Sequence, residues 1–397
     1  MRRWHSWVVV VVLLVTACTQ KLTAPADCPA LCPGGQSTFR DTVLDAVVGQ
    51  DASYAGFSSS LDAIGLLVSS GGGYGESRTV VKFLRRGDSI LVKDTMRAFT
   101  VDSVVIQLTL AKRDTTVTDL VLGLYRLPRT TDTLATFATI DAAMTPANLL
   151  GEITVPNSVT SGGQHLTLAG ADLAKIAFAP GDSTDLAVGV RLRASGPTGV
   201  RLGSLLTGAS APLFTSYVKA AIADTALQKQ RLNRNPSQNR TVRPPDVGST
   251  AGVLPVGGFP ASRAFVRFFL PLYLRDSARI VRATLELTAL QPLVGIPGDT
   301  AHIDARAVLT DFGPKSPVAS NASGAVAILP GMSTFSIELV SVVRAWQGST
   351  PLPPIIRLGL DPEGSTFLTP LIRSTAALTG RPKLRLTYRL PFAFEGF

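Results

Sequence analysis

The stretch Asp102–Leu110 reads DSVVIQLTL and alternates apolar and polar residues over most of its length. The stretch Arg279–Leu290, RIVRATLELTAL, shows the same alternation. A period of two is typical of half-buried β-strands, whose successive side chains point to opposite faces of a sheet. The 35 glycines and 27 prolines punctuate short runs at turn-like intervals, and long amphipathic helical patterns are missing. The sequence therefore predicts an all-β protein.

One sequence pattern occurs twice in the chain. Ser77–Leu84 reads SRTVVKFL and Ser262–Phe269 reads SRAFVRFF, and further apolar strand-like segments follow each octet in the same order. A divergent tandem repeat explains this better than chance, and each copy is long enough to bury its own core. We expect two antiparallel β-sandwiches in series, copy one over residues 47–222 and copy two over residues 246–391, with a short tail at 392–397.

The N-terminus carries an export signal. Two arginines precede the apolar run Trp7–Val15, which is too short to span a bilayer as a helix. Val15, Thr16 and Ala17 stand before Cys18 and resemble the bacterial lipobox. That resemblance implies cleavage after residue 17, acylation of Cys18 and a membrane lipid anchor. Thr19 in place of aspartate points by analogy to the outer membrane, on its periplasmic or outer face. The alternative is an ordinary soluble signal peptide.

Residues 18–46 are expected to form a flexible tether. It holds the remaining cysteines, Cys28 and Cys32, in DCPALCPGG. A local disulfide is the default expectation in an oxidising compartment. A metal site is disfavoured, because no cluster of His, Asp or Glu lies near enough in the sequence to complete four ligands.

Residues 223–245 are polar, basic and contain proline, and we interpret them as a solvated linker between the sandwiches. The alternative is a polyanion-binding arm. Its cations are Lys229, Arg231, Arg234, Arg240 and Arg243.

Several motifs together resemble the DNRLRE family of secreted bacterial β-sandwich modules. These are RAFVRF, the V-x-x-A-x-L-x-L strand, IELVSVVRAW and the closing RPKLRLTY, which match clearly over residues 246–391 and more weakly over 47–222. The resemblance implies a jelly-roll-like sandwich without catalytic function, in a family with members that bind acidic polysaccharides. Copy one departs from the pattern, with Phe178 near the position of Trp346.

Little in the sequence points to catalysis or to a cofactor. His165 and His302 are the only histidines after the signal and lack the partners of a nucleophilic or zinc site. Pairs of acids at 181–185, 298–304 and 361–364 suit turns, and a calcium role for them has no further support. Trp346 shares a helical stripe with neighbouring apolar residues and is predicted to lie in the core.

Cationic strand faces are the candidate ligand surface. The net charge of +10 is compatible with an acidic partner, and nucleic acid is discounted for an exported chain. Arginine presents a planar fork that matches a carboxylate. The candidate residues are Lys383, Arg385, Arg389, Arg263, Arg267 and Arg282. The alternative is that these residues protect sheet edges and keep the protein soluble.

These observations favour a lipid-anchored, non-enzymatic protein of the cell envelope with a structural or binding role, without a cofactor. Two other functions remain open. One is recognition of an acidic polysaccharide through the copy-two cations, and the other is a polysaccharide lyase or hydrolase with dispersed acids and bases. Envelope proteins are a further class of partner.

Overall fold

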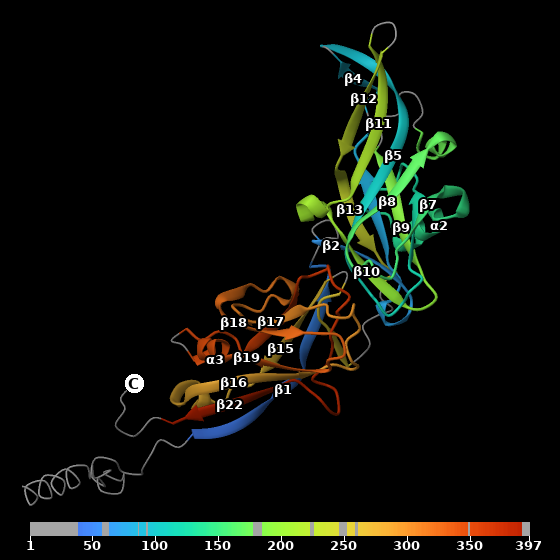
Figure 1. Ribbon diagram of the computed structural model, residues 1–397. Coiled ribbons are helices and arrows are strands. Elements are labelled where there is room, and N and C mark those ends of the chain that lie inside the picture. Colours follow the sequence, from blue (N-terminus) through green and yellow to red (C-terminus); the bar gives the residue numbers. More distant parts are fainter. Residues whose placement is uncertain are drawn as a thin grey trace, which may run out of the picture.

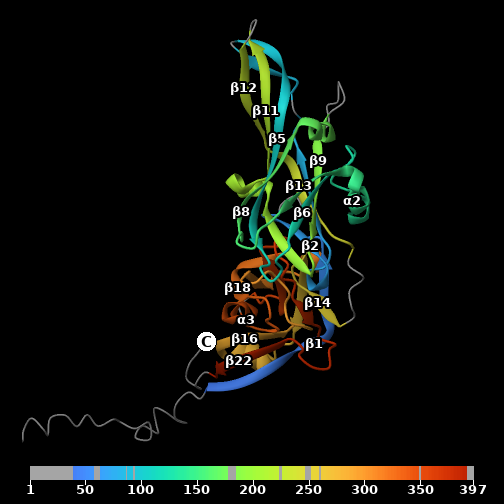
Figure 2. The same cartoon turned by 45° about the vertical axis from the view of Figure 1, so that its right-hand side comes forward.

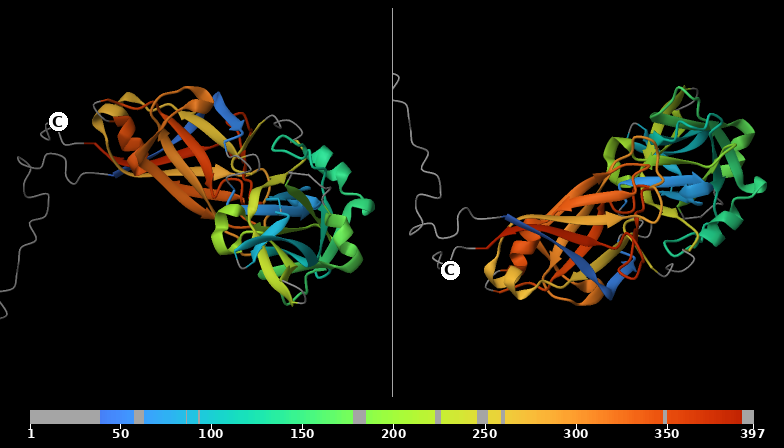
Figure 3. Two further views of the ribbon diagram at one scale, coloured as in Figure 1. Left: turned by 90° about the horizontal axis from the view of Figure 1, so that it is seen from above. Right: turned by 90° about the horizontal axis from the view of Figure 1, so that it is seen from below.

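The prediction of all-β sandwiches is confirmed. The computed structural model describes residues 39–57, 63–85, 87–92, 94–177, 185–222, 226–245, 252–258, 261–347 and 350–390, and large antiparallel sheets dominate it. Cys18, Cys28, Cys32, Phe178 and the tail 392–397 lie outside the described residues. Figure 1, Figure 2 and Figure 3 show two β-rich bodies placed end to end.

The second sandwich is one folded sheet with the strand order β18-β17-β20-β15-β1-β22-β16-β19. A two-stranded sheet, β14 with β21, accompanies it. The elements are β1 (Phe39–Ala55), β14 (Val253–Pro255), β15 (Ser262–Phe268), η7 (Tyr273–Ser277), β16 (Arg279–Thr288), β17 (Ala301–Val308), η8 (Gly313–Lys315), β18 (Val318–Ile328), β19 (Thr334–Glu338), α3 (Val340–Gln347), β20 (Ile355–Asp361), β21 (Leu371–Arg373) and β22 (Lys383–Arg389).

Strand β1 joins the two halves of this sheet. Its first part pairs with β22, from Phe39 opposite Arg389 onward, and its second part pairs with β15. The register shifts between Ala46 and Asp51, which is the irregularity of a β-bulge. Bulges bend a strand and increase its twist. The bend lets a single strand pass from one layer of the sandwich to the other.

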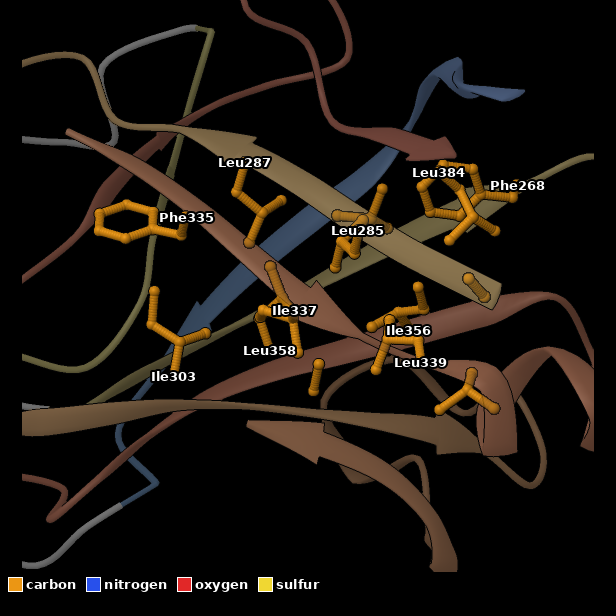
Figure 4. Packing of buried hydrophobic residues seen from close by; sticks show 14 of the residues in the cluster. Phe268, Leu285, Leu287, Ile303, Phe335, Ile337, Leu339, Ile356, Leu358 and Leu384 are labelled. Atoms are coloured by element: carbon orange, nitrogen blue, oxygen red, sulfur yellow. The ribbon is translucent and has the colours of Figure 1, made fainter. Parts of the chain in front are cut away.

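The core of the second sandwich lies between the two halves (Figure 4). Alternate residues of the strands supply it, as the period of two predicts, with Leu285 from one half and Ile303 and Ile356 from the other. The side chain of Trp346 on α3 is only 1% exposed and packs against Phe268, with ring centroids 6.4 Å apart. The core prediction for Trp346 is confirmed.

The first sandwich has two sheets. One has the order β12-β11-β5-β10-β2, with β4 and β8 also paired to β5, and the other has the order β13-β3-β9-β6-β7. The elements are β2 (Gly65–Ser70), η2 (Gly72–Tyr74), β3 (Arg78–Phe83), β4 (Ser89–Val92), β5 (Thr95–Arg113), β6 (Val121–Arg126), α2 (Phe137–Ala143), η3 (Pro146–Asn148), β7 (Leu149–Thr154), β8 (Gly162–Ala169), η4 (Gly170–Ile176), β9 (Leu186–Arg193), β10 (Thr198–Gly203), η5 (Leu205–Ser210), β11 (Leu213–Ile222), β12 (Ala226–Arg234) and β13 (Pro236–Val242).

The segment interpreted as a linker, residues 223–245, is part of the first sandwich from residue 226 onward. Strand β12 pairs with β11 and strand β13 pairs with β3. Arg240 of β13 is buried, and its guanidinium donates to the carbonyl oxygens of Asp132, Thr133 and Ala135. Those hydrogen bonds satisfy a charge that a solvated linker would expose to water. The linker interpretation is therefore wrong.

The two sandwiches have corresponding strands. In the second, β1 lies between β22 and β15, and in the first, β12 and β13 lie beside β11 and β3. In the first sandwich the strand order continues from β13 through β3, β9 and β6. In the second it continues in the same way from β1 through β15, β20 and β17. The pair β12–β13 thus occupies the place that β1 occupies in the other sandwich. Each sandwich receives this joining strand from a different end of its own sequence.

The domain boundaries differ accordingly from those expected. The first sandwich is continuous over residues 63–245, whereas the second combines residues 39–57 with residues 252–390. The segment expected to be tether up to residue 46 therefore contains the start of β1, from Phe39. The repeat in the sequence gave no sign of this arrangement, because a joining strand precedes each copy: β1 precedes copy one, and β12 and β13 precede copy two.

The two sandwiches share a buried interface. Its apolar part consists of Leu67 and Tyr74 from the first sandwich and Ile296 and Phe367 from the second. The rings of Tyr74 and Phe367 meet edge to face, with centroids 5.2 Å apart. The carboxylate of Asp299, in the β16–β17 loop, accepts a hydrogen bond from Arg201 on β10. A buried contact of this kind holds the two bodies in one arrangement.

Candidate functional site

The predicted cationic residues of β22 point outward, as their alternation indicated, but they have partners. Arg385 Nε lies 3.0 Å from Glu286 Oε1 on β16, and Lys383 Nζ lies 3.8 Å from Asp45 on β1. Arg389 is placed directly opposite Phe39 on one side and Arg279 on the other. The face formed by β22 therefore carries alternating charges rather than a row of cations.

The other three predicted residues do not extend that face into one surface. Arg282, on β16 beside β22, donates to Glu338 at 3.0 Å. Arg263 and Arg267 lie on β15, in the other half of the folded sheet. Arg267 forms an ion pair with Asp311 at 2.6 Å. Of the six, Arg263 alone belongs to a hollow in which several arginines meet.

This hollow lies over β15, β17 and β20 on the outside of the second sandwich and has a volume of about 580 Å³. We call it the arginine hollow. Its residues are Arg263, His302, Asp304, Arg306, Ala325, Arg357, Gly359, Leu360, Asp361 and Glu363. It gathers three guanidinium groups, three carboxylates and one imidazole in a single concave surface.

Strand register brings these side chains together. On β17, His302, Asp304 and Arg306 alternate with buried residues, and they lie opposite Asp361, Gly359 and Arg357 of β20. Directly opposite residues in an antiparallel pair point to the same face. Because Gly359 has no side chain, polar side chains approach the middle of the β20 row closely: a Cβ there would lie 3.5 Å from Glu363 Oε1 and 3.7 Å from Arg357 Nη2.

The polar groups of the arginine hollow form two sets of hydrogen bonds. Asp304 Oδ2 accepts from Arg306 Nε at 2.7 Å and from Arg357 Nη2 at 2.9 Å. Glu363 accepts two hydrogen bonds from Arg263, at 2.8 and 2.9 Å. The Arg263 guanidinium also lies 4.4 Å from the centre of the Phe57 ring. These contacts fix the three arginines in place before any ligand arrives.

One donor of the Arg357 guanidinium lacks a hydrogen-bond partner within the described part of the chain. Its Nε is buried and has no acceptor among the residues that the structure describes. Burial, followed by the positive charge of Arg263, lowers the pKa of Arg357 below the usual value for arginine. An oxyanion placed beside Arg357 would offset the positive charge of Arg263 and favour the charged guanidinium. The hollow is thus suited to a ligand that carries a carboxylate together with hydroxyl groups, which Asp304 and Glu363 can accept from.

Arg263 is among the residues predicted from the sequence, whereas Arg306 and Arg357 are not. Both lie at outward positions of strands with the same period of two that identified the other cations. That alternation was the available signal. The convergence depends on the pairing of β17 with β20, which are distant in sequence.

The cations of the supposed linker have diverse positions. Arg243 donates to the carbonyl oxygen of Tyr74, and Arg234 donates to that of Leu84. Lys229 and Arg231 are exposed on β12, where they line a hollow of about 450 Å³ with Tyr217 and Lys219 of β11. Lys229 lies directly opposite Lys219.

The acids discussed as turn or calcium residues mostly serve other contacts. Asp299 bonds Arg201, while Asp304, Asp361 and Glu363 line the arginine hollow. His165 lies exposed on β8, opposite Gln107. Across the described part of the chain, no group of three or more His, Cys, Asp or Glu side chains is placed to hold a metal ion.

Comparison with models of known protein families finds no match for this chain, and none of the curated proteins matches it either. The resemblance to the DNRLRE modules and to the lipobox therefore stays a prediction. Among the described residues, no helix has the length and apolar character needed to cross a membrane.

Proposed function

We propose that this chain is a lipid-anchored, non-catalytic protein of the cell envelope that binds a carboxylate-bearing polysaccharide in the arginine hollow. The observation that carries the proposal is the convergence of Arg263, Arg306 and Arg357 with carboxylate acceptors in one hollow. A structural role in displaying two joined sandwiches is compatible with this binding role.

A uronate residue combines the groups that the hollow complements. Its planar carboxylate matches the fork of an arginine, and its hydroxyl groups match carboxylate acceptors such as Asp304 and Glu363. These two acids accept hydrogen bonds in pairs from arginines, so the donors are already oriented. A preorganised site loses less conformational freedom when it binds a ligand.

Two observations support the anchor. The residues before Cys18 resemble a lipobox, and Cys18 precedes β1 in the chain. Strand β1 begins at the end of the second sandwich that lies away from the first sandwich (Figure 1). An anchor placed there would hold both sandwiches away from the membrane surface. This suits a lipoprotein on either the periplasmic or the outer face of the outer membrane.

The binding proposal is tested with the mature chain from residue 18, made soluble by Cys18→Ser. Its affinity for a polyuronate is compared with that for a neutral glucan, at low and physiological salt. Arg306→Gln should weaken polyuronate binding by about tenfold, since a charge-assisted pair is lost. The control variant carries Lys383→Ala, Arg385→Ala and Arg389→Ala on the β22 face and should bind normally.

Equal weakening by both variants would instead indicate unspecific attraction between charges, which salt screens. Retention of binding in Arg306→Gln would exclude the arginine hollow as the site. The anchor is tested separately by incorporation of a labelled fatty acid in a bacterial host. The label should be present in the unsubstituted chain and absent from Cys18→Ser.

A further inference from the structure

The loop between β15 and β16 closes the end of the second sandwich at which β1 begins. Leu270 and Leu274 of this loop point inward and belong to the core that contains Trp346. Phe269, Leu272 and Tyr273 point outward, with 70%, 64% and 45% of their surfaces exposed. Three large apolar side chains thus face solvent within five consecutive positions.

Strand register places more residues at the same end. Arg389, at the end of β22, lies opposite Phe39, the first residue of β1, and opposite Arg279, the first residue of β16. The rings of Tyr273 and Tyr388 are 5.9 Å apart, which ties the loop to β22. Phe39 is 64% exposed. The aromatic residues and the arginines therefore belong to one surface.

We call this surface the end patch. It consists of Phe39, Arg40, Phe269, Leu272, Tyr273, Arg275, Arg279 and Arg389.

The end patch has more cations than acids. Arg275 pairs with Asp276 at 2.7 Å, and Asp41 accepts a hydrogen bond from Thr387. Arg279 and Arg389 lie directly opposite each other, and like charges in that position are destabilising. An anionic surface would attract the cations of the patch. Exposed aromatic rings beside arginines are the residues that favour the boundary between lipid headgroups and acyl chains.

We propose that the end patch contacts a lipid surface with anionic headgroups. Phe269, Leu272 and Tyr273 would enter the headgroup region, and the arginines would meet lipid phosphates. The inference rests on the anchor of the proposed function, because Cys18 would bring this end of the molecule close to the bilayer. The patch would then fix the orientation of the two sandwiches, which an acyl chain on a tether does not define by itself.

The test uses the unacylated mature chain with Cys18→Ser and vesicles of phosphatidylcholine with or without phosphatidylglycerol. Trp346 is the only tryptophan after the signal and is buried, so Tyr273→Trp supplies a reporter at the patch. Its fluorescence should shift to shorter wavelength with the anionic vesicles and less with phosphatidylcholine alone. The absence of any shift with either vesicle would overturn the proposal.

Variants then locate the contact. Phe269→Ser with Leu272→Ser should lower the partition coefficient on anionic vesicles by at least about tenfold, since two apolar contacts with the lipid are lost. The matched control is Leu206→Ser with Leu378→Ser, which removes two exposed leucines elsewhere and should change it little. Equal partitioning of the two double variants would overturn the proposal.

The other candidate occupant is the chain's own segment 391–397, which is rich in phenylalanine. If that segment covers the patch, its deletion will increase vesicle binding sharply, and the lipid contact will be excluded for the intact chain. Unchanged vesicle binding supports the proposal. Polysaccharide binding and fatty-acid incorporation are measured separately, so failure of the lipid contact is distinguishable from failure of the proposed function.

Discussion

Arg201 Nη1 lies 3.0 Å from Oδ1 and 3.3 Å from Oδ2 of Asp299, across the boundary between the two sandwiches. The Asp299 side chain is almost fully buried, and Thr366 Oγ1 donates to it at 3.0 Å. Lys112 of the first sandwich lies 3.6 Å away. One carboxylate therefore compensates two cations from the neighbouring sandwich.

Removing this carboxylate should destabilise the interface. Asp299→Ala leaves Arg201 and Lys112 without their shared partner, and loss of one member of a buried pair costs about 3 kcal/mol or more. Denaturant unfolding of the soluble mature chain measures the change in free energy. The control, Asp88→Ala, breaks a surface pair with Arg85 and should cost less than about 1 kcal/mol. Similar losses in the two variants would contradict the prediction.

Tyr74 should make the protein sensitive to alkali. Its hydroxyl lies 2.8 Å from Asp114 Oδ2 and 2.9 Å from the carbonyl oxygen of Gly295. Burial, then the hydrogen bond and charge of Asp114, raise the pKa of Tyr74 well above its ordinary value of 10.0. The folded state thus keeps a proton that the unfolded state releases. The stabilisation is complete below pH 10 and is lost as the pH rises from there toward the raised pKa.

Tyr74→Phe should remove part of this alkaline dependence. The substitution lowers the free energy of unfolding at pH 7 by about 1–3 kcal/mol, since it removes the hydroxyl that Asp114 and Gly295 share. Above pH 10 its stability should fall less steeply than that of the unsubstituted chain. Parallel slopes in urea titrations above pH 10 would show that another group is responsible.

Lys229 on β12 should be replaceable with a gain in stability. It lies directly opposite Lys219, and like charges in that position are destabilising by about 0.2–1 kcal/mol. Asp102 compensates Lys219 by an ion pair, which lowers the pKa of Asp102. Lys229→Glu should therefore raise the melting temperature at low salt, and the gain should shrink as salt is added. Lys383→Glu, which disturbs an ion pair with Asp45, should show no gain.

The second sandwich should not fold from residues 246–391 alone, because β1 is missing. Without it, β22 and β15 lose their common neighbour, and the two halves of the core are no longer joined. Residues 39–57 linked directly to 252–390 should restore cooperative unfolding. Residues 63–245 contain all the strands of the first sandwich and should fold alone. Circular dichroism and thermal melts show which of the three fragments fold. A folded 246–391 fragment would refute the role of β1.

Most strands could be predicted from the sequence, because one buried face and one exposed face impose a period of two. This holds for Asp102–Leu110 in β5 and for Arg279–Thr288, which forms β16, and the helical stripe around Trp346 predicted its burial. These features depend on residues close together in the chain. They are readable without knowledge of strand partners.

The joining strands could not be predicted in this way. In β1 a register shift between Ala46 and Asp51 breaks the alternation, and β12 carries polar residues on both of its faces. Nothing in the alternation states which sandwich a strand enters. The same holds for the arginine hollow, where Arg306 and Arg357 meet only because β17 pairs with β20.

The path of β1 also decides how the molecule would respond to a pulling force. Tension between an anchor at Cys18 and a ligand in the arginine hollow would pull β1 along its own axis against the second sandwich, because β1 is the first strand after the anchor (Figure 1). Hydrogen bonds of an antiparallel pair run perpendicular to the strands. Those from β1 to β22 and β15 would therefore be loaded in shear, many at once rather than one after another. The strand that completes the second sandwich would therefore also carry the load between the membrane anchor and the bound ligand.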